Sequence, residues 1–440
     1  MTDALDEPST AQPNRSWLAT IGSARRDPRA RIFNVDLCAA LIAILLPWTT
    51  TGTLIAIGLF VVALLFTDLR ELPDTMRRPA CLIPIAFVLL ALAGTLWSDA
   101  PWLARLHAVA PAAKLLVLLL LIHHFQRSPR GAWVFVAFVV SCTLLMIGSF
   151  AVALEPGLSL KLYLSRGPYK VESGIAVRNY IDQSQAFVLC ALALVYPVAA
   201  QFRAGRIATA LLLAALALAF LANMTFVVVS RTALVTLPLL VAVIALLRLR
   251  ARTALLTAVA LVVAGVLLWS VSPHLRNTVA KFRSDYELST AGNQISGMGS
   301  RLEFWRKSLG FWADAPLIGH GTGSTRGLFE RAVRGQTGLG AEIVGDPHNQ
   351  MLSVAVQWGA LGVIVLSAMW LAHLSLFRGE GLASWIGLLV VLQNMLSSLF
   401  NSHLFDFTEG WTYVLGVGVA GGMIWRSTGA SARRCCSRPG

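Results

Sequence analysis

The side chains that could do chemistry stand in short polar stretches of an otherwise apolar chain. Arg231 lies within or beside a long apolar run, Arg301 opens a polar segment, and His348 stands in Asp346-Pro347-His348-Asn349. Arginine grips phosphate oxygens through its planar fork, and a neutral imidazole can accept a proton. A charge inside a membrane span usually marks function, although an arginine at a helix end can also snorkel to the surface.

A short amphipathic helix is predicted to position Arg301. Ser300 and Glu303 have the spacing of a capping box, with Ser300 as the N-cap and Glu303 at N3. Apolar residues then recur at helical spacing until Asp314-Ala315-Pro316 ends the pattern. Arg301 would stand in the first turn of this helix, where it could be a substrate contact or a purely structural residue.

A second helix start is predicted to position His348. Asp346 fits an N-cap and Pro347 fits N1, where a missing N–H costs nothing. His348 would then lie in the first turn, where the positive end of the helix dipole disfavours imidazolium and keeps a general base neutral. A lone histidine at a membrane interface is usually inert, so that alternative stays open.

Three weaker candidates lie near these stretches. His320 belongs to Gly319-His320-Gly321-Thr322-Gly323-Ser324, whose backbone N–H groups could face an anion or could form a plain loop. Arg178 lies just before an apolar span, in a loop that also holds Lys161, Arg166 and Lys170. Asn349 follows His348 directly.

Composition shows what must carry these residues. The chain of 440 residues is 56% hydrophobic and only 13% charged, whereas a soluble domain has roughly 25% charged residues. Apolar runs long enough to cross a bilayer recur throughout. The sequence therefore predicts an all-α polytopic membrane protein with about twelve spans, at residues 33–48, 51–67, 80–97, 103–123, 132–154, 184–202, 207–227, 232–248, 253–271, 350–376, 382–400 and 411–425.

Charge sets the predicted orientation. Twenty Lys and Arg residues lie in the segments predicted to be cytoplasmic, against five in the short outer loops, so both termini should be cytoplasmic. The predicted organisation is then an N-terminal tail (1–32), nine spans (33–271), a long extracytoplasmic helical loop (272–349), three spans (350–425) and a C-terminal tail (426–440). The long loop holds nine further Lys and Arg residues. They either lie on a solvated surface or bind a polyanion.

Several function classes lack support. The sequence holds no Walker A, dinucleotide-binding, HExxH or GxSxG motif in a suitable context. The outer loops hold no cysteine and only scattered carboxylates, so we expect no metal site and no cofactor. No internal repeat of the kind found in many transporters is evident, and we expect no nucleic acid partner.

Three segments together resemble the O-antigen ligase/polymerase superfamily of bacterial membrane glycosyltransferases. They are Ser230-Arg231-Thr232, the stretch from Arg301-Leu302-Glu303-Phe304-Trp305 to Pro316-Leu317-Ile318-Gly319-His320-Gly321, and Pro347-His348-Asn349 with Gln357-Trp358-Gly359-Ala360-Leu361-Gly362. Their order and the long outer loop between spans nine and ten make the resemblance fairly specific. The predicted layout of spans extends it over nearly the whole chain.

Within that superfamily the chain looks most like an O-antigen ligase. The resemblance implies a GT-C-like, metal-independent, inverting enzyme of the Gram-negative inner membrane, with its active site facing the periplasm. Its implied donor is a glycan on undecaprenyl pyrophosphate, and its implied acceptor is lipid A–core. By the same resemblance, Arg231 and Arg301 would hold the pyrophosphate and His348 would take the proton of the acceptor hydroxyl.

Other readings remain. An O-antigen polymerase and a protein O-oligosaccharyltransferase would use the same donor, and the basic outer face favours the ligase only modestly. A lipid or solute transporter is an alternative of a different class, which the clustering of the candidate residues outside the bilayer does not favour.

Overall fold

The structure is a computed structural model that describes residues 27–160, 174–228, 230–292 and 297–436, and all its elements are helical. The first part of the chain forms α2 (Pro28–Leu45), α3 (Thr50–Leu65), α4 (Leu72–Met76), α5 (Pro79–Ala93), α6 (Trp102–Ala113), α7 (Leu115–Phe125), α8 (Gly131–Leu154), η1 (Pro156–Leu158), α10 (Tyr180–Ala193) and α11 (Val195–Arg203). The second part forms α12 (Ile207–Phe226), α13 (Arg231–Arg248), α14 (Ala251–Val271), α15 (Pro273–Gly292), α16 (Gly297–Asp314), α17 (Thr325–Ala332), η2 (Gly338–Ala341), α18 (Gln350–Leu376), α19 (Leu382–Ser397) and α20 (Phe407–Cys436).

These helices form a polytopic membrane protein. Within the described residues, seven helices are long and apolar enough to cross a membrane, and they coincide with predicted spans four to ten. Three shorter apolar helices, α3, α5 and α19, coincide with spans two, three and eleven. The first and last predicted spans overlap α2 and α20. The all-helical class is thus confirmed, while the number twelve stays a prediction.

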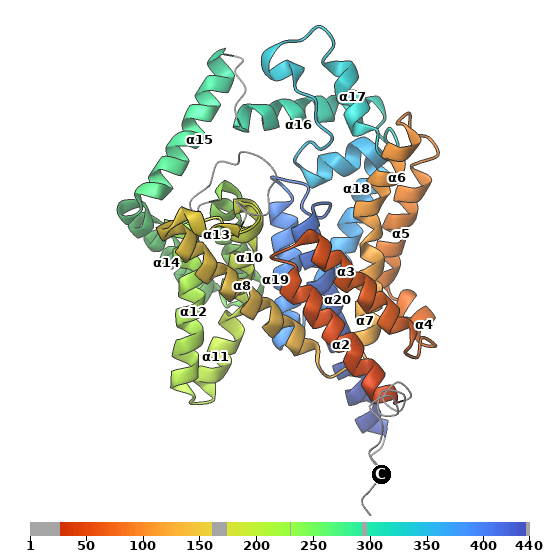
Figure 1. The fold of residues 1–440 in the computed structure, drawn as a ribbon, viewed down its shortest axis with the longest axis vertical. Coiled ribbons are helices and arrows are strands. Elements are labelled where there is room, and N and C mark those ends of the chain that lie inside the picture. Colours follow the sequence, from red (N-terminus) through yellow and green to blue (C-terminus); the bar gives the residue numbers. More distant parts are fainter. Residues whose placement is uncertain (1–26, 161–173, 229, 293–296, 437–440) are drawn as a thin grey trace, which may run out of the picture.

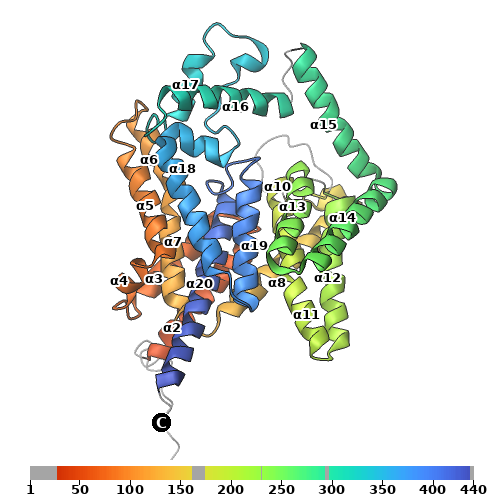
Figure 2. The ribbon, with the colours of Figure 1, turned by 180° about the vertical axis from the view of Figure 1, so that it is seen from behind.

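The helices pack as a bundle with an appendage at one end. Figures 1 and 2 show α15, α16 and α17 beyond one end of the bundle, whereas α2 begins and α20 ends at the other. We call the first of these the site end. The start of α2 and the end of α20 thus lie opposite α15, α16 and α17, and the cytoplasmic assignment of the two tails stays a prediction. Buried apolar side chains from most of the helices form one core between the two ends.

Helix α18 is broken inside the bundle, and the loop after α16 fills the break. Gly359 has φ 60° and ψ −155°, which only glycine adopts readily. The break frees backbone groups on both sides. His320 and Gly321 donate their N–H groups to Val356 O and Gln357 O, and Ala360 and Leu361 donate theirs to Pro316 O and Leu317 O. The 316–321 loop therefore replaces the missing helical hydrogen bonds, as burial requires.

Other contacts hold the same loop against α5. The Thr322 N–H donates to Gly94 O at 2.9 Å, and its hydroxyl donates to Ala91 O at 2.6 Å. The indole of buried Trp358 donates to the Thr322 hydroxyl at 2.8 Å and packs edge-on against Phe87. The outer part of α18, α5 and the loop are thereby fixed to one another, just below α16.

We expect Gly359→Ala to destabilise the protein severely. The positive φ alone costs a side chain about 1–3 kcal/mol, and the new Cβ would also collide with the backbone of Leu317. The measurement is the thermal stability of the purified protein in detergent. Gly265→Ala in α14 is the control, because no atom lies within 4 Å of its Cβ position. Equal stability of the two variants would contradict this account of the break.

Candidate active site

Helix α16 lies over the segment that precedes α18. The Trp305 indole donates to Pro347 O at 3.1 Å, and the Phe304 ring lies 6.2 Å from the His348 ring. Phe304 also packs edge-on against Phe329 of α17. These contacts bring the Arg301 stretch and the His348 stretch together, although the two residues are far apart in sequence.

The predicted start of α16 is wrong by four residues, because Ser300 as the N-cap would make Arg301 the first helical residue. The helix begins at Gly297, so Ser300 lies inside it and Arg301 is not in the first turn. Glu303 does not reach back to a cap. Its carboxylate accepts two hydrogen bonds from Arg306, at 2.8 and 2.7 Å, and lies 3.6 Å from the Lys307 ammonium. The Glu303 carboxylate is thus engaged by two cations one turn further along the helix, so it does not cap the backbone N–H groups before it.

The predicted start of α18 is also wrong. Asn349, not Asp346, is the N-cap, and its side-chain oxygen accepts from the Leu352 N–H at 3.1 Å. Pro347 and His348 therefore precede the helix. Asp346 is used instead to close a local turn, because its Oδ1 accepts from the His348 N–H at 3.2 Å and from the Ser402 hydroxyl at 2.6 Å. The weak candidate Asn349 is thus a capping residue.

The glycine-rich loop does not offer an anion-binding nest. The N–H groups of His320, Gly321 and Thr322 donate to backbone carbonyls, and that of Gly323 donates to the Gln357 side chain at 2.9 Å. These donors are consumed inside the protein, so the plain-loop alternative is the right one. His320 Nε2 lies 2.7 Å from Phe311 O, which makes the histidine a brace between the loop and α16.

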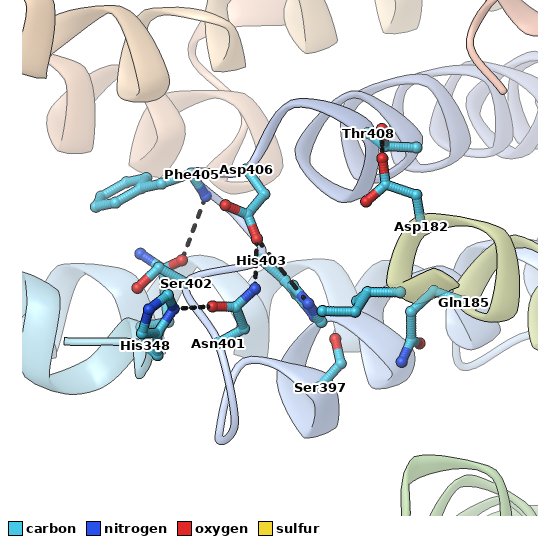
Figure 3. Close-up of polar contacts among 12 residues, drawn as sticks. Asp182, Gln185, His348, Ser397, Asn401, Ser402, His403, Phe405, Asp406 and Thr408 are labelled. Atoms are coloured by element: carbon cyan, nitrogen blue, oxygen red, sulfur yellow. Dashed lines mark hydrogen bonds and ion pairs between the residues drawn. The ribbon is translucent and has the colours of Figure 1, made fainter. Parts of the chain in front are cut away.

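His348 is held in an unusual conformation with one ring nitrogen engaged. Its φ of 55° is the one positive value among the described non-glycine residues. Such strain persists only where the surroundings enforce it, and it clusters at functional sites. The His348 Nδ1 lies 2.7 Å from Asn401 Oδ1 (Figure 3). The other nitrogen, Nε2, is the one left for a substrate.

Residues between α19 and α20 complete the site, and sequence reasoning missed them. Asn401 Nδ2 donates to Asp406 Oδ2 at 2.9 Å, and the buried His403 lies 3.9 Å from the same oxygen (Figure 3). Burial, together with Arg301 and His348, lowers the pKa of His403 to about 3, so this ring is neutral. The available signal was the polar run Asn401-Ser402-His403 between two apolar spans.

Arg301 lies close enough to Arg231 to feel its charge. Burial lowers the pKa of Arg301, the nearby Arg231 lowers it further, and Tyr180 and Asp346 raise it. Arg231 is the first residue of α13, capped by Ser230, so it lies at a helix end and not inside the span. Two like charges that interact in this way favour the binding of an anion nearby.

Helix termini add to the positive potential. Helices α10, α13 and α18 begin at Tyr180, Arg231 and Gln350, close to Arg301 or His348. The N-terminus of a helix carries a partial positive charge and favours anions within its first turn. Burial raises the pKa of Asp346, a carboxyl group that interacts electrostatically with Arg301, and this weakens its competition with an anion for that arginine. The arrangement can hold a polyanion beside His348.

Arg178 is placed differently. Its guanidinium forms an ion pair with Asp182 at 3.2 Å, donates to Leu46 O at 3.4 Å and lies over the Phe407 ring. These contacts are those of a residue that ties α10 to α2 and α20. The neighbouring candidates Lys161, Arg166 and Lys170 lie outside the described residues.

Metal ligands were not expected, and the described residues contain no group of three or more His, Cys, Asp or Glu that could hold a metal ion. Metal independence itself stays a prediction, because only an activity measurement can test it.

Fold and site together define a helical membrane protein with a cationic, histidine-containing site at one end of its bundle. Residues 214–367 match the family model described as O-antigen ligase. Over these residues the match confirms the resemblance to the O-antigen ligase/polymerase superfamily. No curated protein sequence matched the chain.

The match includes Arg231, Arg301 and His348 and ends before Asn401. The match does not distinguish a donor or an acceptor.

The capping role of Asn349 predicts how its variants behave. Asn349→Ala should cost about 1 kcal/mol of stability, with a range of about 0.5–2 kcal/mol, and Asn349→Asp should restore most of it because aspartate also caps. Thermal unfolding of the purified variants measures this. A substrate contact would behave in the opposite way: stability would stay the same and only binding of the lipid-linked glycan would weaken.

Proposed function

We propose that the protein is an O-antigen ligase, which transfers O-antigen from undecaprenyl pyrophosphate to lipid A–core at the periplasmic face of the inner membrane. The observation that carries this proposal is the meeting of Arg231, Arg301 and His348 at the site end of the bundle. A pyrophosphate between two arginines and an acceptor hydroxyl beside a histidine are the two groups that such a transfer must bring together.

The arginines act on the leaving group. As the bond between the anomeric carbon and the pyrophosphate oxygen breaks, negative charge develops on that oxygen. Two guanidinium groups at a partly desolvated site stabilise this charge without a metal, because their forks match the phosphate oxygens. Pyrophosphate leaves without a proton donor, so the second carboxyl group of many glycoside hydrolases is not needed.

The histidine acts on the acceptor. Nε2 of neutral His348 takes the hydroxyl proton while the acceptor oxygen attacks the anomeric carbon from the side opposite the pyrophosphate. One glycosidic bond forms, one bond to phosphate oxygen breaks, and the anomeric configuration inverts. The proton ends on the imidazole and then passes to water.

The first test is genetic. Deletion of the gene should remove the long O-antigen ladder from the lipopolysaccharide on a gel and leave the core intact. A core that carries one repeat unit would indicate a polymerase instead. Normal lipopolysaccharide with an altered protein glycan would indicate a protein O-oligosaccharyltransferase, and an unchanged glycan profile would favour a transporter.

His348→Ala should lower the rate of ligation by purified protein at least about a hundredfold, since general base catalysis contributes about 10²–10⁴ in rate. His320→Gln is the matched control, because the His320 Nε2 is engaged by Phe311 O. The reaction is run with excess EDTA, in which the wild-type enzyme should keep its activity. Near-normal ligation by His348→Ala would show that His348 is not the general base. Activity that is lost in EDTA and restored only by Mg²⁺ or Mn²⁺ would show that the arginines alone do not stabilise the leaving group.

Arg231→Lys and Arg301→Lys should both be strongly impaired. Lysine keeps the charge and loses the planar fork. A desolvated, charge-assisted contact in the transition state contributes about 2–4 kcal/mol, or about thirty- to a thousandfold in rate. Rates are normalised to folded protein. Arg326→Lys is the control, since Arg326 is an exposed residue of α17 paired with Glu330. If both lysine variants match this control, the bidentate clamp is wrong.

A further inference from the structure

The Asn401 amide lies between a histidine and a carboxylate. Its oxygen faces His348 Nδ1 at 2.7 Å and its nitrogen faces Asp406 Oδ2 at 2.9 Å (Figure 3). An amide nitrogen can only donate and an amide oxygen can only accept. While Asp406 is a carboxylate, which only accepts, the amide has one favourable orientation. Its oxygen must then face the imidazole.

That orientation decides which nitrogen of His348 carries the proton. A ring nitrogen that faces an acceptor oxygen must be protonated to make the hydrogen bond, and the tautomer of a neutral histidine is set by such a partner. Nδ1 therefore carries the hydrogen. The lone pair stays on Nε2, the nitrogen that faces away from Asn401.

The carboxylate end of this chain is itself anchored. The backbone N–H groups of Phe405 and Asp406 donate to Ser402 O at 2.8 and 3.0 Å. Lys114, buried between α6 and α7, donates to the carbonyl oxygens of Phe405 and Asp406 at 3.1 and 2.6 Å. The turn that presents Asp406 is thus fixed to the bundle and not only to the site it serves.

The start of α18 is fixed to the same turn. The Gln350 side-chain oxygen accepts from the Leu404 N–H at 3.0 Å, and the Gln350 N–H donates to Ser398 O at 3.0 Å. His348 and Asn401 therefore sit on two segments that are joined on both sides of their own hydrogen bond. A side-chain pair supported in this way keeps its geometry when substrate arrives.

We propose that Asn401 and Asp406 are positioning residues, which hold neutral His348 as the Nδ1–H tautomer and so keep its Nε2 lone pair directed at the acceptor hydroxyl. This inference rests on the proposed function of His348 as the general base. When Nε2 takes the proton, the Asn401 oxygen still accepts from Nδ1–H, and the Asp406 carboxylate offsets part of the new positive charge.

The proposal implies a dependence on pH through Asp406. Burial, Asp346 and Asp182 raise the pKa of Asp406 to about 7, and Lys114 lowers it. Glu409 and His403 also face the group. The carboxylate, present above this pKa, holds the amide. As the pH falls through about 7, protonated Asp406 can donate to the amide oxygen, and the amide can turn its NH₂ toward His348.

The direct test is the tautomer itself. Protein labelled with ¹⁵N-histidine is studied by solid-state NMR in lipid at pH 8, and the His348 signals are those lost in His348→Ala. In the wild type Nδ1 should be protonated and Nε2 bare. Asn401→Ala should move the population toward Nε2–H. Asn394→Ala is the matched control, since it removes a buried asparagine from α19 that bonds the Trp370 indole. An unchanged His348 spectrum in Asn401→Ala would overturn the proposal.

Kinetics supply the second readout. Asn401→Ala should lower kcat about ten- to a hundredfold with little change in KM, because the base is misdirected and not removed. Asn401→Asp keeps an acceptor oxygen at Nδ1 and should shift the pH profile upward, since a carboxylate stabilises imidazolium. Asp406→Asn alone should lower kcat. In the Asn401→Ala background the same change should lower kcat little further, because Asp406 acts through Asn401.

These outcomes separate the inference from the proposed function. Losses that multiply in the double variant would show that Asp406 acts independently, and the positioning chain would be wrong. A tautomer shift in Asn401→Ala without any loss of rate would confirm the chain and show that His348 is not the base.

Discussion

The break in α18 at Gly359 is the constraint on which the site depends. An intact helix would carry its hydrogen bonds past residues 356–361 and leave the 316–321 loop with unpaired backbone groups in the bundle. The break instead exposes two carbonyls and two N–H groups, and the loop satisfies all four. Because α16 leads into this loop and His348 precedes α18, one pairing sets the position of both Arg301 and the histidine.

The same pairing explains why two motifs far apart in sequence occur together. Pro316-Leu317-Ile318-Gly319-His320-Gly321 and Gln357-Trp358-Gly359-Ala360-Leu361-Gly362 contain no residue that must touch a substrate. They are the two halves of one backbone interface. Gly319 has φ 64°, and a Cβ there would collide with the backbone of Gln357 and Trp358. The glycines allow these two segments of the chain to approach closely, and they do not bind an anion.

The helical class was predictable from sequence, because hydropathy is a strong local signal. Arg231, Arg301 and His348 also stood out in the sequence, and their roles stay predictions. The helix starts were not. Ser300 and Asp346 both fit cap patterns, but Glu303 is held by Arg306 and Asp346 is held by Ser402, and neither partner could be identified from spacing. Asn401 and Asp406 were missed for a related reason: their role exists only through His348, which lies on another segment.

The placement of Asn401 and Asp406 has a consequence for biogenesis. Arg231, Arg301 and His348 all leave the ribosome before the turn between α19 and α20, which is synthesised later and is anchored by Lys114 from the first half of the chain. Domains form as they emerge, and partly made chains expose incomplete surfaces. A nascent chain that already holds the cationic residues therefore has a histidine with no partner. The contacts of His348 with Asn401 and of Asn401 with Asp406 therefore form only when the last hairpin has inserted.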